Sequence, residues 1–186
     1  MRNFGLIVSV LLGVVAVAAE AETGYSAPAG KRSHLLRDSG PRILVIQGAP
    51  APGVSNGNNH GLKGVLVYER PHLQPFGAVA AQEVFEWHHE QRLGVDRARS
   101  GKRRMEIASH AVESLVANRF YGFDLDRYER WEAASMRRYP HLRGMSEGEI
   151  AGAMRASRVQ AEKWVRQNAG LIRALVEFRF PRERTP

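Results

Sequence analysis

Two short apolar runs rich in β-branched residues predict β-strands. Residues 42–47, RILVIQ, end at a Gly-Ala-Pro turn, and residues 64–70, GVLVYER, alternate in polarity before a proline. Runs of this length, bounded by glycine and proline, are typical of strands. The segment between them, 48–63, consists of turn-forming residues, and we expect it to be either a mobile loop or an ordered lid.

From residue 77 onward, apolar positions recur at helical spacing. The pattern predicts helices over 78–93, 102–121, 124–139 and about 147–168. Asp124 is a predicted N-cap, and Ser146 with Glu149 has the spacing of a capping box. The pattern does not decide the secondary structure of a last apolar stretch, 171–178. The sequence therefore predicts an α+β fold, mainly α, with at least four helices and a small two-stranded edge sheet.

The first residues predict an export signal. Three residues including Arg2 precede an uncharged apolar run from Phe4 to Ala19, which is shorter than the ~20 residues that a transmembrane helix needs. The Ala-Glu-Ala sequence that ends at Ala21 fits signal peptidase, with cleavage after Ala18 as the alternative. An uncleaved membrane anchor is a second interpretation. We expect a periplasmic or extracellular protein.

Three regions are predicted along the chain. Residues 1–21 form the signal peptide, and residues 22–41, rich in Gly, Ser, Ala, Pro and charge, form a flexible leader. Residues 42–186 form a single globular domain, a length that can bury a real core.

The amino-acid composition limits the kinds of function that this chain can have. The chain has no cysteine, which excludes disulfides, thiolate metal sites and a cysteine nucleophile. Its formal net charge of +8 favours an anionic envelope component (lipid, peptidoglycan or protein) as partner, rather than nucleic acid. A plain solvated surface is the alternative, because the basic residues are scattered. We expect membrane contact only through an uncleaved signal.

Polar residues form a line along each of the first two predicted helices. They are Gln82, Glu83, Glu86 and His89 on the first, and Glu106, His110 and Glu113 on the second. Residues with this spacing lie above one another on one side of a helix, so each line can contact a common ion or substrate. Carboxylate and imidazole are suitable ligands for zinc and related divalent metals.

The order of these elements resembles the core of zincin metallopeptidases. In that family a strand is followed by a helix with the motif H-E-x-x-H, whose histidines bind zinc and whose glutamate is the general base. In one branch a later glutamate completes the site. Here GVLVYERP corresponds to the strand and AQEVFEWHHE to the helix. The resemblance implies Glu83 as the general base and Glu106 as the third ligand, but Gln82 and Glu86 replace both histidines, so no activity is carried over.

Three interpretations follow for the polar lines. In the first, the fold is zincin-like and the zinc site is lost, leaving a divergent or non-catalytic protein. In the second, a divalent metal such as zinc is bound by Glu86, His89, His110 and either Glu106 or Glu113. In the third, the acids face water and pair with nearby arginines, with about 0–1 kcal/mol for each exposed pair.

Two further functions stay open at this stage. Paired carboxylates across a cleft would suit glycoside hydrolysis. A non-enzymatic basic envelope protein that binds an anionic partner is the alternative to a metallopeptidase-like core.

Overall fold

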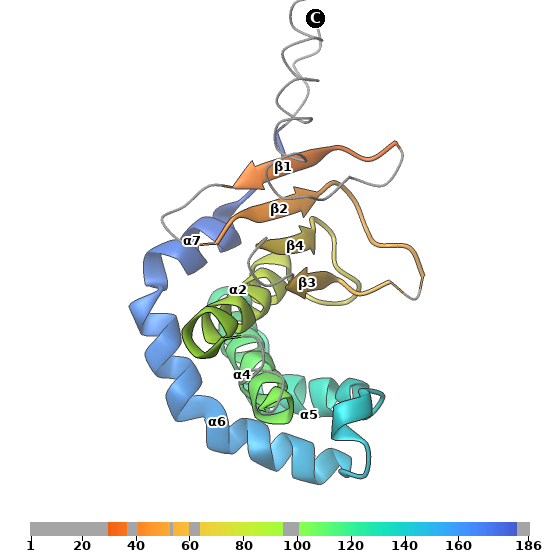
Figure 1. Ribbon diagram of the computed structural model, residues 1–186, viewed down its shortest axis with the longest axis vertical. Helices are drawn as coiled ribbons and strands as arrows, with labels where there is room; N and C mark the ends of the chain where they lie inside the picture. The colour runs from red at the N-terminus through yellow and green to blue at the C-terminus, as the bar shows by residue number, and fades with distance from the viewer. Residues whose placement is uncertain (1–29, 37–40, 53, 60–63, 95–100, 182–186) are drawn as a thin grey trace, which may run out of the picture.

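The computed structural model describes residues 30–36, 41–52, 54–59, 64–94 and 101–181. These residues form a mainly helical α+β structure with a four-stranded mixed sheet and five α-helices, which confirms the predicted fold class (Figure 1). The predicted signal peptide lies outside the described residues.

The sheet has the strand order β1-β2-β4-β3. Its strands are β1 (Ser33–Leu36), β2 (Ile43–Ile46), β3 (Gly57–Asn59) and β4 (Val65–Tyr68). The two predicted strands, β2 and β4, pair in parallel at the centre, with Ile43 opposite Val65. The edge strands β1 and β3 pair antiparallel to them. All four residues of β2 are buried, as expected for a central strand with both faces covered.

The prediction of a two-stranded sheet was wrong, because both edge strands fell in segments assigned to loops. β1 lies within the range predicted as a flexible leader, 22–41, and β3 lies within the predicted loop, 48–63. The Gly-Asn-Asn sequence of β3 has low strand propensity. Its strand conformation comes from pairing with β4, a tertiary interaction that local sequence does not encode.

The helices are α2 (Phe76–Leu93), α4 (Lys102–Tyr121), α5 (Leu125–Met136), α6 (Glu147–Gln167) and α7 (Ala169–Glu177), with a 3-10 turn, η2 (Pro140–Leu142). Asp124 caps α5 by accepting a hydrogen bond from the Arg127 amide, and the predicted capping box begins α6. The four predicted helices are therefore confirmed, although α5 ends earlier than expected. The undecided stretch is helical in α7.

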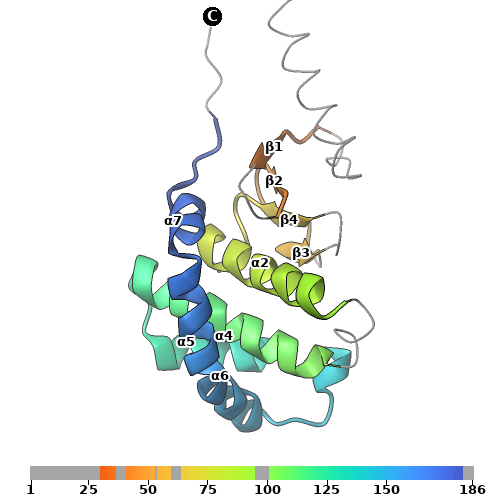
Figure 2. The ribbon, with the colours of Figure 1, turned by 60° about the vertical axis from the view of Figure 1, so that its left-hand side comes forward.

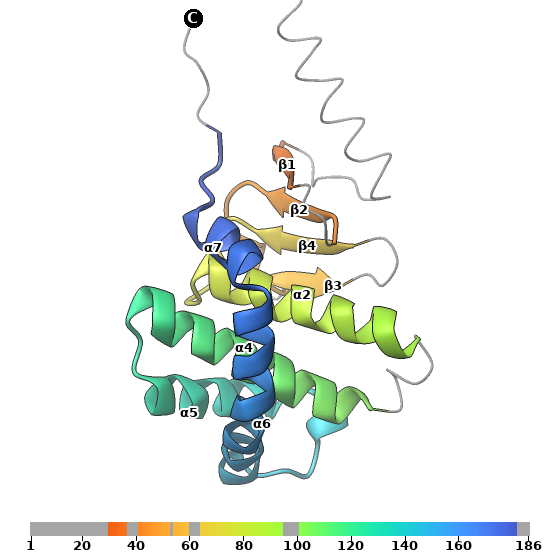
Figure 3. The same ribbon diagram turned by 90° about the vertical axis from the view of Figure 1, so that its left-hand side faces the viewer.

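Helices α2, α4 and α5 lie one below another under the sheet, whereas α6 and α7 run along one side of this stack (Figures 2 and 3). α2 packs between the sheet and α4, and α6 crosses α4 and α5 at a steep angle. The largest apolar cluster joins α4, α5 and α6, with Val112, Met136 and Met154 fully buried. Because neighbours cover α2 and α4 on several sides, their polar lines are buried as well, except for His89. A search of the described helices for a bilayer-spanning candidate finds none.

Candidate metal centre

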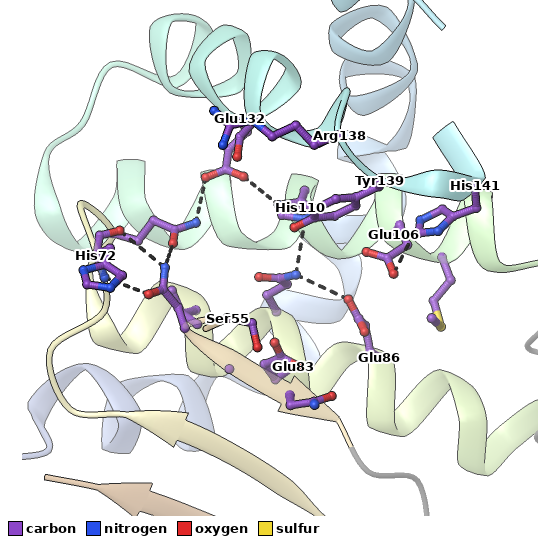
Figure 4. A pocket seen from close by; sticks show the side chains of 18 of the residues that line it. Ser55, His72, Glu83, Glu86, Glu106, His110, Glu132, Arg138, Tyr139 and His141 are labelled. Carbon is purple, nitrogen blue, oxygen red and sulfur yellow. Dashed lines mark hydrogen bonds and ion pairs between the residues drawn. The ribbon is translucent and has the colours of Figure 1, made fainter. Parts of the chain in front are cut away.

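The polar lines of α2 and α4 meet at one pocket. A cavity of about 1090 Å³ lies between β3, α2, α4, α5 and η2 (Figure 4). Five residues of the two predicted lines face it and are buried: Gln82, Glu83, Glu86, Glu106 and His110. The interpretation that these acids are solvated surface residues was therefore wrong.

His89, the remaining member of the predicted metal set, does not line this cavity. Its ring stacks on Phe85 with the centroids 6.3 Å apart, and its side chain is half-buried. Glu86, Glu106 and His110 share the cavity. Among the described residues, a different set of side chains lies close enough together to bind a metal ion, and it includes His110.

His110 and Glu113 of α4 and Glu132 of α5 form this cluster, which we call the α4–α5 triad. One ligand atom from each lies within 4.8 Å of the others, so the triad could hold a metal ion. His110 Nδ1 lies 2.7 Å from Glu132 Oε2 and 3.3 Å from Glu113 Oε2. The exposed fractions of the three residues are only 2%, 0% and 1% in chain order. The triad lies at the inner wall of the cavity, which His110 and Glu132 line.

Neutral donors hold the outer oxygens of the two carboxylates. Gln74 Nε2 donates to Glu113 Oε1 at 2.8 Å and to Glu132 Oε1 at 2.9 Å. The Tyr128 hydroxyl also donates to Glu113 Oε1, at 2.7 Å. These contacts leave the Oε2 atoms directed at His110. Glu113 Oε2 is buried and accepts no hydrogen bond from any described residue, which is a rare state for a buried oxygen.

Burial and charge shift the pKa values within the triad. Burial alone would lower the pKa of His110, but the adjacent Glu132 and Glu113 carboxylates outweigh it and raise this pKa well above its ordinary value. Burial, together with the charge of Glu132, raises the pKa of Glu113 to about 7. Two carboxyl groups thus share one imidazole, and a bound cation would take the place of the protons that these three groups hold.

The α2 side of the cavity presents two further perturbed acids. Burial and the charge of Glu106 raise the pKa of Glu86 to about 7, although Ser109 and Gln82 donate hydrogen bonds to it. Burial, then the charges of Glu86 and Glu106, raise the pKa of Glu83 well above its usual value. No hydrogen bond to Glu83 is found among the described side chains. In Figure 4, Glu83 and Glu86 rise from α2 while His110 and Glu132 approach from the opposite side.

Sequence reasoning missed Glu132, and a signal for it was present. Glu129, Glu132, Ala133 and Met136 follow the i, i+3, i+4, i+7 spacing of a core-facing helix stripe, and all four are buried. Acids at core positions indicate a buried polar site. Gln74 lies in a turn and has no comparable signal. Trp131 of the same helix is 38% exposed and lines the cavity.

The chain has no match among family models, curated proteins or solved structures. The resemblance to zincin metallopeptidases therefore stays a prediction. The structure adds that the close ligand cluster lies on α4 and α5, whereas the family motif would place its zinc histidines on α2.

Proposed function

We propose that this protein is an exported, metal-dependent hydrolase with a divergent metallopeptidase-like core. In this proposal His110, Glu113 and Glu132 hold a divalent ion such as zinc. The observation that carries the proposal is the pair of buried Oε2 atoms that face one imidazole nitrogen, one of them without a hydrogen-bond donor. No described Lys or Arg forms an ion pair with either carboxylate.

The chemistry of the triad favours a zinc-type ion. Two carboxylates and one imidazole are a ligand set that zinc accepts, and three protein ligands leave a position for water or substrate. A bound ion of this kind lowers the pKa of its water ligand toward 7. Burying an unmatched carboxylate costs several kcal/mol, and a cation between the two Oε2 atoms would offset that cost.

Gln82 lies against the other ring nitrogen of His110. Gln82 Nε2 is 3.4 Å from His110 Nε2 and 3.3 Å from Glu86 Oε1. A metal ion at Nδ1 would use the lone pair of that nitrogen and leave the ring proton on Nε2. Gln82 would then accept this proton through its side-chain oxygen, once its amide group has turned over.

Glu83 is the residue that we assign to proton transfer. Its carboxyl group faces the cavity, and its raised pKa suits a group that can hold and donate a proton. The backbone of β3 lies directly against it, because a Cβ atom added to Gly57 would lie 2.8 Å from Glu83 Oε1.

The substrate class follows from β3. In the described sheet β3 pairs only with β4, so its second edge is available to an extended chain. Residues of β3 and the carboxyl of Glu83 line the same cavity. A polypeptide added along β3 would therefore pass beside the proposed proton-transfer group, which makes a peptide bond the proposed target.

Metal binding tests the first half of this proposal. In equilibrium dialysis against Zn²⁺, we expect about one equivalent bound by the wild-type chain and by the exposed control variant Glu177→Gln. Glu113→Gln and Glu132→Gln are expected to lose it. Zinc-free wild-type protein whose melting temperature is the same with and without chelator would contradict the metal site.

Peptide hydrolysis tests the second half. Zinc-loaded wild-type protein is incubated with a fluorogenic peptide library, beside Glu83→Gln that has been shown to retain its zinc. General acid–base catalysis contributes about 10²–10⁴-fold, so Glu83→Gln should lose activity by that factor. Equal rates for the two proteins would remove Glu83 from the mechanism.

A further inference from the structure

A chain of side-chain amides connects the edge strand β3 to the α4–α5 triad. Asn56, the residue before β3, accepts a hydrogen bond from the His72 amide at 2.8 Å and donates to the His72 carbonyl at 3.3 Å. The Asn56 amide also donates to Gln74 Oε1. Gln74 in turn donates to the Oε1 atoms of Glu113 and Glu132. Both side-chain amides therefore use their donors and their acceptors. Figure 4 draws the part of this network that runs from His72 to Glu132.

The segment that this network holds is strained. Leu73 lies between His72 and Gln74, and it is the described non-glycine residue with positive φ, at 61°. A left-handed conformation is unfavourable at such a residue and persists only where its surroundings impose it. The Leu73 side chain is 83% exposed, so its own packing supplies little compensation. The hydrogen bonds made by His72 and Gln74, on either side of Leu73, hold this turn.

The network also sets the position of β3. The Asn56 carbonyl accepts a hydrogen bond from the Tyr68 amide at 3.0 Å, which continues the pairing of β3 with β4. Asn56 is thus bonded to the sheet through its backbone and to the turn through its side chain. Any change in the position of Gln74 is therefore transmitted to Asn56, the residue that precedes β3.

We propose that Asn56 and Gln74 are positioning residues through which a metal ion at the triad fixes β3 for peptide binding. The inference rests on the proposed metal site. An ion bound to the Oε2 atoms holds both carboxylates in place, and their Oε1 atoms then make fixed, charge-assisted hydrogen bonds to Gln74. Because linkage is reciprocal, a peptide on β3 strengthens metal binding by the same factor.

A purely structural role for the amides predicts something different. If Asn56 and Gln74 only satisfy buried acceptors, their loss lowers the melting temperature without changing how β3 responds to metal. The discriminating quantity is therefore the change in backbone protection at β3 when zinc binds, measured in each variant.

Hydrogen exchange of the full chain with and without Zn²⁺ measures this quantity. In the wild type, we expect zinc to slow exchange of the Tyr68 amide, which bonds to the Asn56 backbone carbonyl, about tenfold, within the usual range of coupling between sites. The variant Asn58→Ala, on the same strand but outside the network, should behave like the wild type. Asn56→Ala should still bind one equivalent of zinc and lose the slowing.

Two further variants keep the test decisive. Asn56→Asp retains the acceptor for the His72 amide and removes the donor to Gln74 and to the His72 carbonyl, so it should also lose the zinc effect if Asn56→Ala folds poorly. Gln74→Leu should weaken zinc binding about 10–100-fold.

The outcomes separate the two proposals. Zinc-dependent slowing that is unchanged in Asn56→Ala and Asn56→Asp would overturn the positioning role while the metal site stands. Zinc binding to the wild type with no slowing at β3 would do the same. Failure of the wild type to bind zinc would remove the proposed function together with this inference.

Discussion

Two buried glutamates of α5, three residues apart, differ in the charged groups that surround them. Glu129 is fully buried and receives two hydrogen bonds from Arg158 of α6, at 2.8 Å and 2.7 Å. Glu132 is equally buried but faces His110 and the second carboxylate of Glu113. The first acid has a matching guanidinium, whereas the second shares one imidazole with another acid.

This difference separates a structural site from a ligand site. Arg158 also contacts Asp126, and hydrogen bonding to Glu129 raises the pKa of this guanidinium, which joins α5 to α6. The charges of the α4–α5 triad do not cancel in this way. Two acids buried without a cation destabilise the fold unless a cation binds between them. This cost is the physical basis of the metal proposal.

The largest effect should come from breaking the matched pair. Arg158→Ala leaves Glu129 buried without a partner and should lower the free energy of unfolding by about 3 kcal/mol, the lower end of the usual range. The low value follows because the Arg158 side chain is 25% exposed and water replaces part of the contact. Urea denaturation measures it. A loss under about 1 kcal/mol would mean that Glu129 is not held as an isolated buried charge.

The next largest effect should come from the buried acids of the pocket. In the presence of chelator, they should make the stability of the protein depend on pH. Folding raises the pKa of Glu113 and of Glu86 from 4.5 to about 7, so the native state binds protons more tightly than the unfolded chain. Stability is then greatest below pH 4.5 and falls as the pH rises from about 4.5 through about 7. The raised pKa of His110 extends this decline above 6.5.

Thermal melts of the chelated protein between pH 5 and pH 8 measure this slope. Glu113→Gln should flatten it, and the exposed variant Glu177→Gln should leave it unchanged. Stability that rises with pH across this interval would show that the buried acids of the pocket are matched after all.

The smallest effect concerns the helix that carries Arg158. Ser146 Oγ accepts a hydrogen bond from the Glu149 amide at 3.2 Å, and the Glu149 carboxylate accepts one from the Ser146 amide at 2.7 Å. Ser146→Ala should cost about 1 kcal/mol in urea denaturation. Zinc affinity should not change, because α6 contributes no residue to the triad. A parallel loss of zinc affinity would mean that the two clusters are coupled.

The sequence predicted those parts of the fold that local chemistry determines. Gly122 ends α4 in the left-handed conformation, and the Ser146 capping box begins α6, both as expected from residue type. β1 and β3 could not be predicted, because their strand conformation depends on pairing partners far along the chain.

The candidate site was predicted in part for the same reason. Helical spacing placed Glu83, Glu86, Glu106 and His110 on shared helix faces, and these residues do reach one cavity. Spacing within a helix cannot show which residue of a later helix lies opposite, so Glu132 was missed and His89 was included. Export and an anionic partner stay predictions.

The central claim is that the unmatched acids on α4 and α5 bind a metal ion. Anomalous diffraction at the zinc absorption edge, from zinc-soaked crystals of the full chain, locates the ion directly. We expect a strong peak about 2.0–2.2 Å from His110 Nδ1, Glu113 Oε2 and Glu132 Oε2. A triad without a peak, or zinc bound only between Glu106 and His141, one turn along α4 from His110, would contradict the account.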